Sequence, residues 1–368
     1  MSNQTIAELF DVRSHNPSFF SVKDRFADRR QLLDFCIPVN LHFPPREFLA
    51  MVRENLPEIL RYYPDYAEVH QQHLADITGL NFNTIVPCNG STEIITKLCQ
   101  HAQGPVVTSV PTFSRWTDLP TELKVPLHTI QRRSENEFRL DVDAIVSFVR
   151  SVRARTLVLS NPNNPTGAGM SFEEIRYVAS SLPDLDAVII DESFIDFSDL
   201  GSCATTVSEY DNLIVVKSLG KSIGWHGVRL GYAVAEPRRA TGLRSGLPFW
   251  NINGLAAYVL KMVTRFLDVY RSSFDLVSED RCYMRESLAT VPGLKIYPSA
   301  ANFLFVELPP HRPGKKLRDR LIGKYGIMVR ECSNKIGASE QYLRLAVQTP
   351  AAVDQLISAL NTELMSSR

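Results

Sequence analysis

The sequence predicts an α/β protein in which a mostly parallel sheet covered by helices forms a large domain, followed by a smaller α+β domain. The chain has 368 residues, which exceeds the usual size of a single hydrophobic core. Apolar, β-rich runs alternate with helical patterns between residues 85 and 250, as in helix-covered parallel sheets. Beyond residue 300, short segments alternate like the strands of a second unit. We therefore expect an N-terminal segment over residues 1–45, a large domain over 46–255 and a small domain over 256–368.

The individual elements are predicted from local patterns. The strands of the large domain are short apolar runs: Thr84–Pro87, Pro105–Ser109, Thr156–Ser160, Ala187–Asp191, Asn212–Lys217 and Leu230–Ala235. Helical spacing is found over Phe172–Leu182, after a turn at Asn163–Gly169, and over Leu255–Val269, which leaves the large domain. The small domain is predicted to contain two strands and two helices, in chain order Ala300–Leu308, Leu317–Lys324, Tyr342–Val347 and Ala352–Met365.

Composition limits the classes of function. Lys plus Arg and Asp plus Glu each number 40, so a net charge of zero gives no support for a nucleic-acid or membrane-surface partner. The N-terminus lacks a basic-then-apolar leader, and no apolar stretch reaches membrane-spanning length. The six cysteines are dispersed, with no Cys-x-x-Cys pair. They indicate reduced, mostly buried thiols in a cytoplasmic protein, with neither a disulfide frame nor a metal site.

The most informative cluster is the run from Lys217 to Arg229. It combines the hydroxyl of Ser218, the amine of Lys221 and the guanidinium of Arg229, with small residues between them. A hydroxyl and a guanidinium suit a phosphate group, and an amine can form a Schiff base with an aldehyde. Pyridoxal phosphate carries both groups. Lys217 is an alternative to Lys221, although Lys217 falls on the predicted strand and not in the turn after it.

Three further segments carry polar residues to the ends of predicted strands or to the start of a helix. The run SNPNNPTG occupies residues 160–167, directly after an apolar strand, and another strand ends in Asp191 and Glu192. Residues 89–93, NGSTE, open a helical stretch. In an open α/β sheet, ligands bind beyond the carboxyl ends of the strands. Independent strands are therefore expected to bring these residues to one edge.

These segments, in this order, resemble the fold-type-I pyridoxal-phosphate enzymes, the aspartate aminotransferase superfamily. Within it the chain is most similar to the branch of histidinol-phosphate aminotransferases and threonine-phosphate decarboxylases, and the likeness runs from residue 30 to residue 350. The resemblance implies the pyridoxal-phosphate-dependent transferase fold, with a seven-stranded-type sheet in the large domain. It also implies an N-terminal segment that folds back onto the small domain, and a homodimer with shared active sites.

The resemblance also implies roles around the cofactor ring. Lys221 would form the Schiff base, and Asp191 would pair with the pyridine nitrogen, with Glu192 as an adjacent alternative. Asn164 would donate to the ring oxygen. Phe194 stands where many aminotransferases carry a Tyr that contacts this oxygen, and Phe at this position is more like the decarboxylases.

Other residues match positions around the phosphate and the ring face. By the resemblance, the phosphate would be held by backbone amides and side chains of Gly90, Ser91, Thr92, Ser218 and Arg229. Phe113 matches the aromatic residue that stacks on the ring, with Trp116 close enough to substitute. Tyr63 matches a Tyr that reaches the phosphate of the neighbouring subunit.

Three residues match substrate-binding positions. Arg344 matches the Arg that clamps the substrate carboxylate, and a bidentate carboxylate suits an inward-facing Arg. Arg330 matches an Arg that holds the substrate's own phosphate in the decarboxylases, although it can also be a surface residue paired with Glu331. Asn40 matches an Asn near the substrate.

The sequence leaves amino transfer, decarboxylation and other pyridoxal-phosphate reactions, such as oxidation, elimination or cyclisation, open. An aminotransferase is the main expectation because amino transfer is the commonest activity of the superfamily, and a threonine-phosphate-decarboxylase-like activity is the alternative. The decarboxylases carry a His-Gly-Gly segment for the substrate phosphate, whereas this chain has His15-Asn16-Pro17. The Asn-x-Asn-Pro of the branch is likewise changed to Pro38-Val39-Asn40-Leu41.

Overall fold

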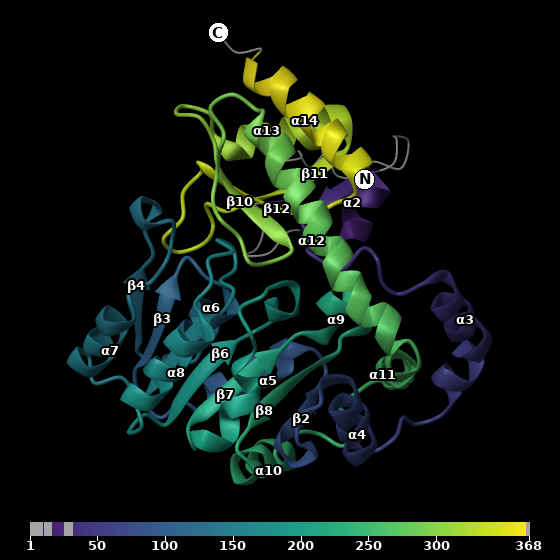
Figure 1. Cartoon of the computed structure of the whole chain (residues 1–368), viewed down its shortest axis with the longest axis vertical. Coiled ribbons are helices and arrows are strands. Elements are labelled where there is room, and N and C mark those ends of the chain that lie inside the picture. Colours follow the sequence, from purple (N-terminus) through teal and green to yellow (C-terminus); the bar gives the residue numbers. More distant parts are fainter. Residues whose placement is uncertain (1–9, 11–16, 26–31, 366–368) are drawn as a thin grey trace.

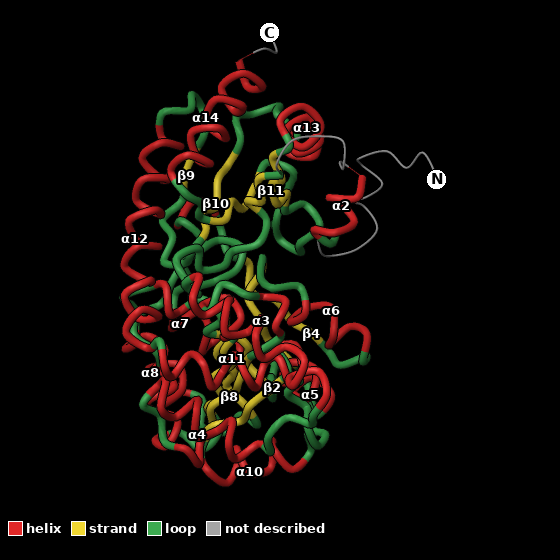
Figure 2. Tube along the Cα trace, turned by 90° about the vertical axis from the view of Figure 1, so that its right-hand side faces the viewer, coloured by secondary structure: helices red, strands yellow, loops and turns green. Residues whose placement is uncertain are grey.

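The computed structural model describes residue 10 and residues 17–25 and 32–365. Figure 1 shows two bodies stacked along the long axis, each built around its own sheet. The long helix α12 (Leu267–Ala289) runs from the seven-stranded body into the five-stranded one, and Figure 2 shows it along one side of the molecule. None of the described helices combines the length and apolar character needed to cross a membrane.

The larger sheet has seven strands in the order β2-β8-β7-β6-β5-β3-β4. The strands from β7 through β6, β5 and β3 to β4 pair in parallel, whereas β8 is antiparallel to both neighbours, β7 and β2. The predicted α/β fold with a mostly parallel sheet is therefore confirmed. Strand bounds are β2 Ile85–Cys88, β3 Val106–Val110, β4 Leu127–Gln131, β5 Thr156–Ser160, β6 Ala187–Asp191, β7 Leu213–Lys217 and β8 Gly231–Ala235.

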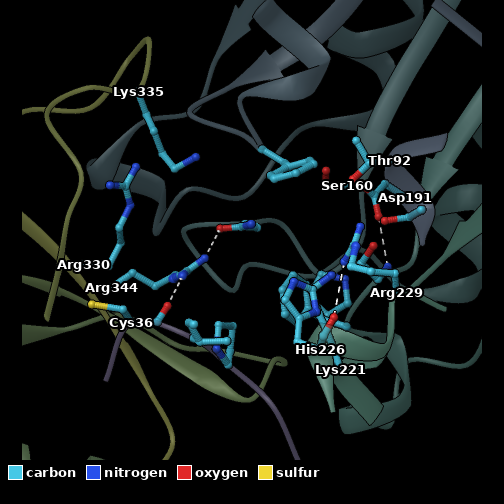
Figure 3. Close-up of a pocket in the computed structure, with 18 of the residues that line it drawn as sticks. Cys36, Thr92, Ser160, Asp191, Lys221, His226, Arg229, Arg330, Lys335 and Arg344 are labelled. Carbon is cyan, nitrogen blue, oxygen red and sulfur yellow. Dashed lines mark hydrogen bonds between the residues drawn. The ribbon is translucent and has the colours of Figure 1, made fainter. Parts of the chain in front are cut away.

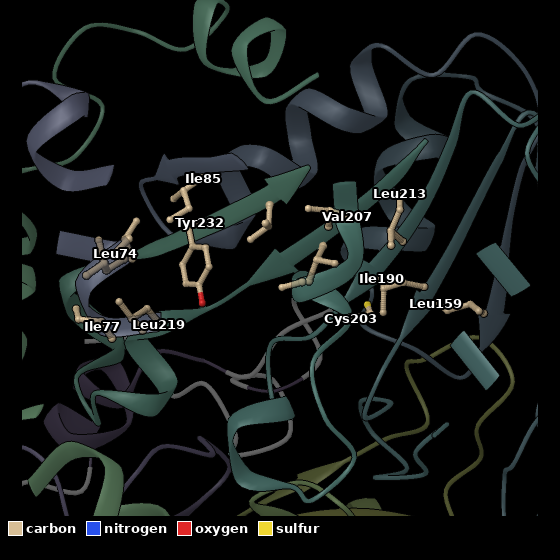
Figure 4. Close-up of a cluster of buried hydrophobic side chains, with 14 of the residues drawn as sticks. Leu74, Ile77, Ile85, Leu159, Ile190, Cys203, Val207, Leu213, Leu219 and Tyr232 are labelled. Atoms are coloured by element: carbon tan, nitrogen blue, oxygen red, sulfur yellow. The ribbon is translucent and has the colours of Figure 1, made fainter. Parts of the chain in front are cut away.

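The central strands are buried along their whole length because helices cover both faces of the sheet. Successive side chains of a strand point to opposite faces, so Leu159 and Ile190 enter one core cluster (Figure 4) while Val158 and Ile189 enter the other. The helices of this body are α3 Arg46–Arg61, α4 Ala67–Thr78, α5 Ser91–Gln100, α6 Arg115–Glu122, α7 Val142–Ser151, α8 Phe172–Ser181, α9 Leu219–Ser222, α10 Pro237–Ser245 and α11 Gly254–Arg265. Short 3-10 turns lie at Phe82–Thr84, Ser134–Asn136, Ile195–Phe197, Cys203–Glu209 and His226–Val228.

The smaller sheet has five strands in the order β1-β11-β12-β10-β9. Its edge strand β1 comes from the N-terminal segment and pairs in parallel with β11, so this segment joins the second sheet. The strands are β1 Leu33–Phe35, β9 Lys295–Ile296, β10 Phe303–Glu307, β11 Ile327–Glu331 and β12 Tyr342–Ala346. The helices are α2 Phe19–Arg25, α12, α13 Gly314–Arg320 with a π-helical turn Leu321–Tyr325, and α14 Pro350–Met365.

The structure contains strands that were not predicted, β1, β9 and β11 of the small sheet and β4 of the large one, and it divides one predicted helix. The strand β4 was not predicted, because its residues are half-buried or exposed at the sheet edge and lack an apolar run. The predicted helix Leu255–Val269 is two helices, α11 and α12, which meet at Phe266. Phe266 has φ −116° and ψ 27°, outside the helical range, and no Pro or Gly marks this break in the sequence.

Candidate active site

A pocket of about 380 Å³ lies between the two sheets, beyond the carboxyl ends of β3, β5 and β6. The large-sheet side contributes Phe113, Asn164, Asp191 and Lys221, and the small sheet contributes arginines of β11 and β12. Figure 3 shows Thr92, Asp191 and Arg229 on one side of the pocket, with Arg330, Lys335 and Arg344 on the other. The edge expected from the topology thus brings together polar residues that lie far apart in sequence.

Lys221 is the amine that faces the pocket. It lies in the short helix α9 directly after β7, with Nζ 4.8 Å from the centre of the Phe194 ring. Burial lowers the pKa of Lys221 to about 8, opposed by the nearby carboxylate of Asp191. The alternative, Lys217, ends β7 and lies 3.1 Å from Asp196 and 3.5 Å from Glu192. Burial alone lowers the pKa of Lys217, but these carboxylates raise it above its ordinary value, so Lys217 is a paired structural cation.

Asp191 ends β6 and is 4% exposed. Its Oδ2 accepts a hydrogen bond from Trp116 Nε1 at 2.7 Å, and its Oδ1 accepts one from the Ser193 amide at 3.0 Å. The alternative carboxylate, Glu192, accepts from the Cys203 amide at 2.8 Å and lies outside the pocket lining. Trp116, considered as a stacking residue, is instead fully buried behind Asp191, whereas Phe113 lines the pocket.

The start of α5 and Arg229 form a concave anion-binding surface. Ser91 and Thr92 begin this ten-residue helix and line the pocket, and the N-terminus of a helix favours a negative charge. Gly90 has φ +71°, and a Cβ at Gly90 would collide with the guanidinium of Arg229. A Cβ at Gly231 would collide with the Ser91 amide nitrogen, so both glycines permit the close approach. Ser218 is buried at the start of α9, beside this surface but outside the pocket lining.

Arg344 connects the small sheet to the loop that follows β5. Its Nη1 donates to Asn164 Oδ1 at 2.8 Å and its Nη2 donates to the Cys36 carbonyl at 2.6 Å. Its Nε is buried with no hydrogen-bond partner, and among the described residues no carboxylate forms an ion pair with this guanidinium. Burial lowers the pKa of Arg344 to about 10. A buried cation with an unused donor is suited to an anionic ligand.

Arg330 lies opposite Arg344 in the pairing of β11 with β12. It is 7% exposed and lines the pocket, which contradicts the alternative of a surface residue. Its Nη2 donates to Asn334 Oδ1 at 2.8 Å. Glu331, the partner expected in that alternative, accepts hydrogen bonds from the Ser333 amide at 2.7 Å and from its hydroxyl at 3.0 Å.

Two predicted residues lie away from the pocket. We expected Asn40 near the substrate, but it is buried beneath α9, where its Nδ2 donates to the Ser222 carbonyl at 3.0 Å and to Ser273 Oγ at 2.6 Å. Its backbone amide also donates to the Lys221 carbonyl at 2.9 Å, so Asn40 joins the N-terminal segment to α9. Tyr63 is 81% exposed and stacks on Trp250 at 4.8 Å, and its contact with a second subunit stays a prediction.

The N-terminal segment also reaches the pocket. Pro17, Ser18 and Phe19 line it, together with the stretch from Cys36 to Pro38. His15 and Asn16, which depart from the His-Gly-Gly segment of the resembling decarboxylases, lie outside the described residues.

Among the basic side chains that line the pocket, sequence reasoning missed His226 and Lys335. The Nδ1 atom of His226 is buried without a hydrogen-bond partner, and burial together with Lys221 and Arg229 lowers the pKa of this imidazole to about 3. The position of His226 between Lys221 and Arg229 could have indicated it. Lys335 follows β11 in a polar turn, where nothing in the sequence indicates burial. Within the described part of the chain, no group of His, Cys, Asp and Glu is placed to hold a metal ion.

Comparison with known proteins gives consistent matches over nearly the whole chain. The profile of the family "aminotransferase class I and II" matches residues 31–360. An L-serine phosphate decarboxylase of Campylobacter jejuni is 29% identical over 364 residues, covering 94% of this chain and 92% of that protein. A histidinol-phosphate aminotransferase of a Thermoanaerobacter species is 30% identical over 333 residues, covering 87% and 91%. The solved structure of a decarboxylase from Sulfurospirillum multivorans superposes with a TM-score of 0.88 at 29% identity, covering 99% of this chain and 95% of that one.

The pocket fits pyridoxal phosphate, the cofactor of this family. The absence of a side chain at Gly90 lets the Arg229 guanidinium lie against the start of α5, where both line the pocket as a site for a phosphate, and Lys221 offers an amine of lowered pKa. Asp191 offers a buried carboxylate at the same side of the pocket. Since the family profile runs through both sheets and through each strand that meets the pocket, the chain belongs to the aminotransferase class I and II family and is a pyridoxal-phosphate-dependent enzyme.

Proposed function

We propose that this enzyme is a decarboxylase of an L-amino acid whose side chain carries a phosphate. The observation that carries the proposal is the pair of buried arginines, Arg330 and Arg344, opposite each other on β11 and β12. An α-amino acid brings one carboxylate, which suits Arg344. A second buried arginine facing the same pocket calls for a second anion on the substrate.

The relatives favour decarboxylation over the aminotransferase expected first. The L-serine phosphate decarboxylase of Campylobacter jejuni covers more of this chain than the histidinol-phosphate aminotransferase does, and the superposed decarboxylase structure covers nearly all of it. Phe194 adds support because it places a ring without a hydroxyl near Lys221, where many aminotransferases of the resembling family carry a Tyr. The second anion site alone fits either reaction, since the aminotransferase relative is also named for a phosphorylated substrate.

Decarboxylation needs no second substrate. The bond between Cα and the carboxylate breaks, carbon dioxide leaves, and a proton takes its place on Cα to give a phosphorylated amine. Pyridoxal phosphate, when bound, supplies the electron-withdrawing ring that accepts the electron pair from this bond. Amino transfer would instead require a keto acid to regenerate the enzyme.

The side chains of the pocket supply orientation and proton transfer. Arg344 binds the carboxylate and fixes its direction relative to Lys221, while Arg330 binds the side-chain phosphate. The backbone and side chains at the start of α5, with Arg229, bind the phosphate of the cofactor. With its pKa lowered to about 8, Lys221 can hold a proton near neutral pH and release it to Cα.

Product analysis tests this proposal. The holoenzyme is incubated with O-phospho-L-serine, O-phospho-L-threonine or histidinol phosphate, each with 2-oxoglutarate as amino acceptor, and carbon dioxide, phosphorylated amine and glutamate are measured. We expect one equivalent of carbon dioxide per phosphorylated amine. Glutamate formed without carbon dioxide would overturn the decarboxylase assignment in favour of amino transfer.

The two arginines should have separable effects. Arg344→Ala should lower kcat/KM for phosphorylated and unphosphorylated substrates alike, because every substrate brings the carboxylate. The corresponding rise in activation free energy should be roughly 2–4 kcal/mol. Arg330→Ala should reduce kcat/KM selectively for phosphorylated substrates. An equal or negligible effect of Arg330→Ala on both substrates would remove the second anion site from the proposal.

We further propose that the enzyme works as a homodimer with shared sites. The aromatic residues Tyr63, Phe249 and Trp250 are exposed, and the Trp250 ring contacts both of the others. An exposed aromatic cluster of this kind supports an interface. By the family resemblance, Tyr63 would contact the cofactor phosphate of the partner subunit.

A further inference from the structure

Lys335 reaches from the small sheet across the pocket to the large one. It lies in the turn between β11 and β12 and is 6% exposed. Its Nζ donates to the Thr112 carbonyl at 2.9 Å and lies 3.3 Å from Ser114 Oγ, on either side of Phe113. Figure 3 shows Lys335 and Arg330 on the same side of the pocket, opposite Thr92 and Asp191.

The ammonium group of Lys335 is buried without a compensating charge. Both of its hydrogen-bond partners are neutral oxygen atoms, and an ammonium group has three donors. Among the described residues, no Asp or Glu forms an ion pair with it. Burial, with a further contribution from Arg330, lowers the pKa of Lys335 to about 7. Such a lysine is costly in the free protein and becomes favourable when an anion binds beside it.

The charges of the pocket show how many anions it can take. Among the described residues that line it, Asp191 is the one carboxylate, whereas five side chains are Lys or Arg: Lys221, Arg229, Arg330, Lys335 and Arg344. The cofactor accounts for Lys221 and Arg229, and the substrate carboxylate accounts for Arg344. Two cationic side chains remain, adjacent to each other. A phosphate monoester carries a charge of about −1.5 to −2 at pH 7, whereas a side-chain carboxylate carries only one negative charge.

We propose that Lys335 is a specificity-determining residue that, together with Arg330, binds a doubly charged phosphate on the substrate side chain. This inference rests on the proposed function for the place of the substrate in the pocket. It concerns the charge that the pocket selects and is independent of which bond at Cα breaks.

The competing explanation is that Lys335 only clamps the β11–β12 turn to the loop around Phe113. A clamp requires hydrogen-bond donors to the Thr112 carbonyl, and its loss would affect every ligand alike. An anion site requires the positive charge, and its loss would affect only ligands that carry the phosphate. A pair of ligands that differ only in the phosphate therefore separates the two explanations.

Binding of phosphoethanolamine and ethanolamine to the holoenzyme provides this pair. Neither ligand has a carboxylate, so the measurement does not depend on decarboxylation. In isothermal titration, Lys335→Met should raise the Kd for phosphoethanolamine about 10- to 100-fold while changing the Kd for ethanolamine about twofold or less. Lys335→Arg should retain most of the phosphate selectivity, and Lys124→Met, at an exposed lysine, should change neither Kd. Equal losses for the two ligands would overturn the proposal and leave the clamp.

Proton uptake tests the same inference in the unaltered protein. At pH 8 free Lys335 is mostly neutral, phosphoethanolamine is already a dianion, and binding should draw a proton onto Lys335. The charged and titratable groups that affect the pKa of Lys335 are Arg330, Cys332, Arg344 and Asp118. Binding of ethanolamine serves as the reference, because it includes the proton changes of the ligand amine and of Lys221. Titrations in buffers of different ionisation enthalpy should show more protons taken up with phosphoethanolamine than with ethanolamine. Equal proton uptake would contradict the inference, and this test needs no variant of Lys335.

The outcomes distinguish this inference from the proposed function. Phosphate selectivity that depends on Lys335, in an enzyme that forms keto acid from its substrates, would support the anion site and reject decarboxylation. Carbon dioxide release from O-phospho-L-serine with no role for Lys335 in phosphate binding would do the reverse.

Discussion

Trp116→Phe is expected to weaken the hold of the enzyme on its cofactor and to slow turnover. Asp191 is almost fully buried, and its Oδ2 accepts a hydrogen bond from the indole Nε1 of Trp116 at 2.7 Å. The Ser193 amide supplies the only other hydrogen bond found for this carboxylate in the described chain, at 3.0 Å. Phe keeps most of the ring but removes the donor, so the carboxylate keeps one of its two bonds and becomes freer to rotate.

The magnitude follows from the charge and burial of the acceptor. A hydrogen bond to a charged group contributes about 1.5–3 kcal/mol, and 1.4 kcal/mol corresponds to about a factor of ten. We therefore expect Trp116→Phe to lower kcat about 10- to 100-fold and to raise the Kd of pyridoxal phosphate, followed by the fluorescence or absorbance of the bound cofactor. The absorbance band of the bound cofactor should also shift, which a purely structural role of Trp116 would not produce.

A control is needed because Phe is smaller than Trp and leaves a cavity. Leu119→Ala removes buried volume from the same helix α6 and the same core cluster without touching Asp191. It should lower Tm by an amount similar to or greater than Trp116→Phe but leave the cofactor absorbance unchanged. If both variants gave the same change in kcat and no spectral shift, the hydrogen bond to Asp191 would have no positioning role.

Four further outcomes are expected. Lys221→Ala should leave no cofactor covalently attached after borohydride reduction, and attachment at another lysine such as Lys217 would contradict the assignment. Because burial lowers the pKa of Lys221 to about 8, the amine is protonated below that pH and neutral above it, so covalent uptake of cofactor by the apoenzyme should speed up with pH and level off above about pH 8; a rise that continues to pH 10 would indicate an ordinary lysine. Asp191→Asn should raise the activation free energy by roughly 2–4 kcal/mol, which lowers kcat tens to hundreds of fold, with a smaller effect on cofactor affinity. Near-normal turnover would show that Asp191 has only a structural role. Mixed dimers of Tyr63→Phe and Lys221→Ala subunits should recover part of the activity if the sites are shared, whereas full activity of an isolated monomer would exclude sharing.

The central strands could be predicted from the sequence because they are buried on both faces. Predicted Thr156–Ser160 and Ala187–Asp191 coincide with β5 and β6, where continuous apolar runs end in polar residues. The edge strand β4 has no such run, since all of its residues are half-buried or exposed, whereas the other edge strand, β2, is buried along its length. The break at Phe266 depends on how α12 turns toward the second sheet, and this tertiary constraint leaves no local signal.

The cofactor side of the pocket was more predictable than the substrate side. Lys221, Asp191 and Arg229 are expected at the pocket because strand ends of one sheet deliver them to a common edge. The position of Lys335 in the pocket depends on the packing of one sheet against the other, whereas the sequence shows only a lysine in a polar turn. Trp116 was the alternative to Phe113 for the ring face, but its indole donates a hydrogen bond to Asp191, since the sequence does not give the direction of its side chain.

The bonds between the two sheets explain how the substrate side can control the cofactor side. Arg344 donates to Asn164, which follows β5, and Lys335 donates to Thr112, which follows β3. Asn164 uses its carbonyl oxygen for this bond, which leaves its amide N–H groups for the ring oxygen of the cofactor. By the proposed function, a carboxylate bound at Arg344 would act on the side chain expected to contact the ring, and a phosphate bound at Lys335 would act on the loop that carries Phe113. If the proposed anion sites are correct, a change of substrate charge specificity would require changes at Arg330 in β11 and at Lys335 in the β11–β12 turn, and none at Lys221 or Asp191.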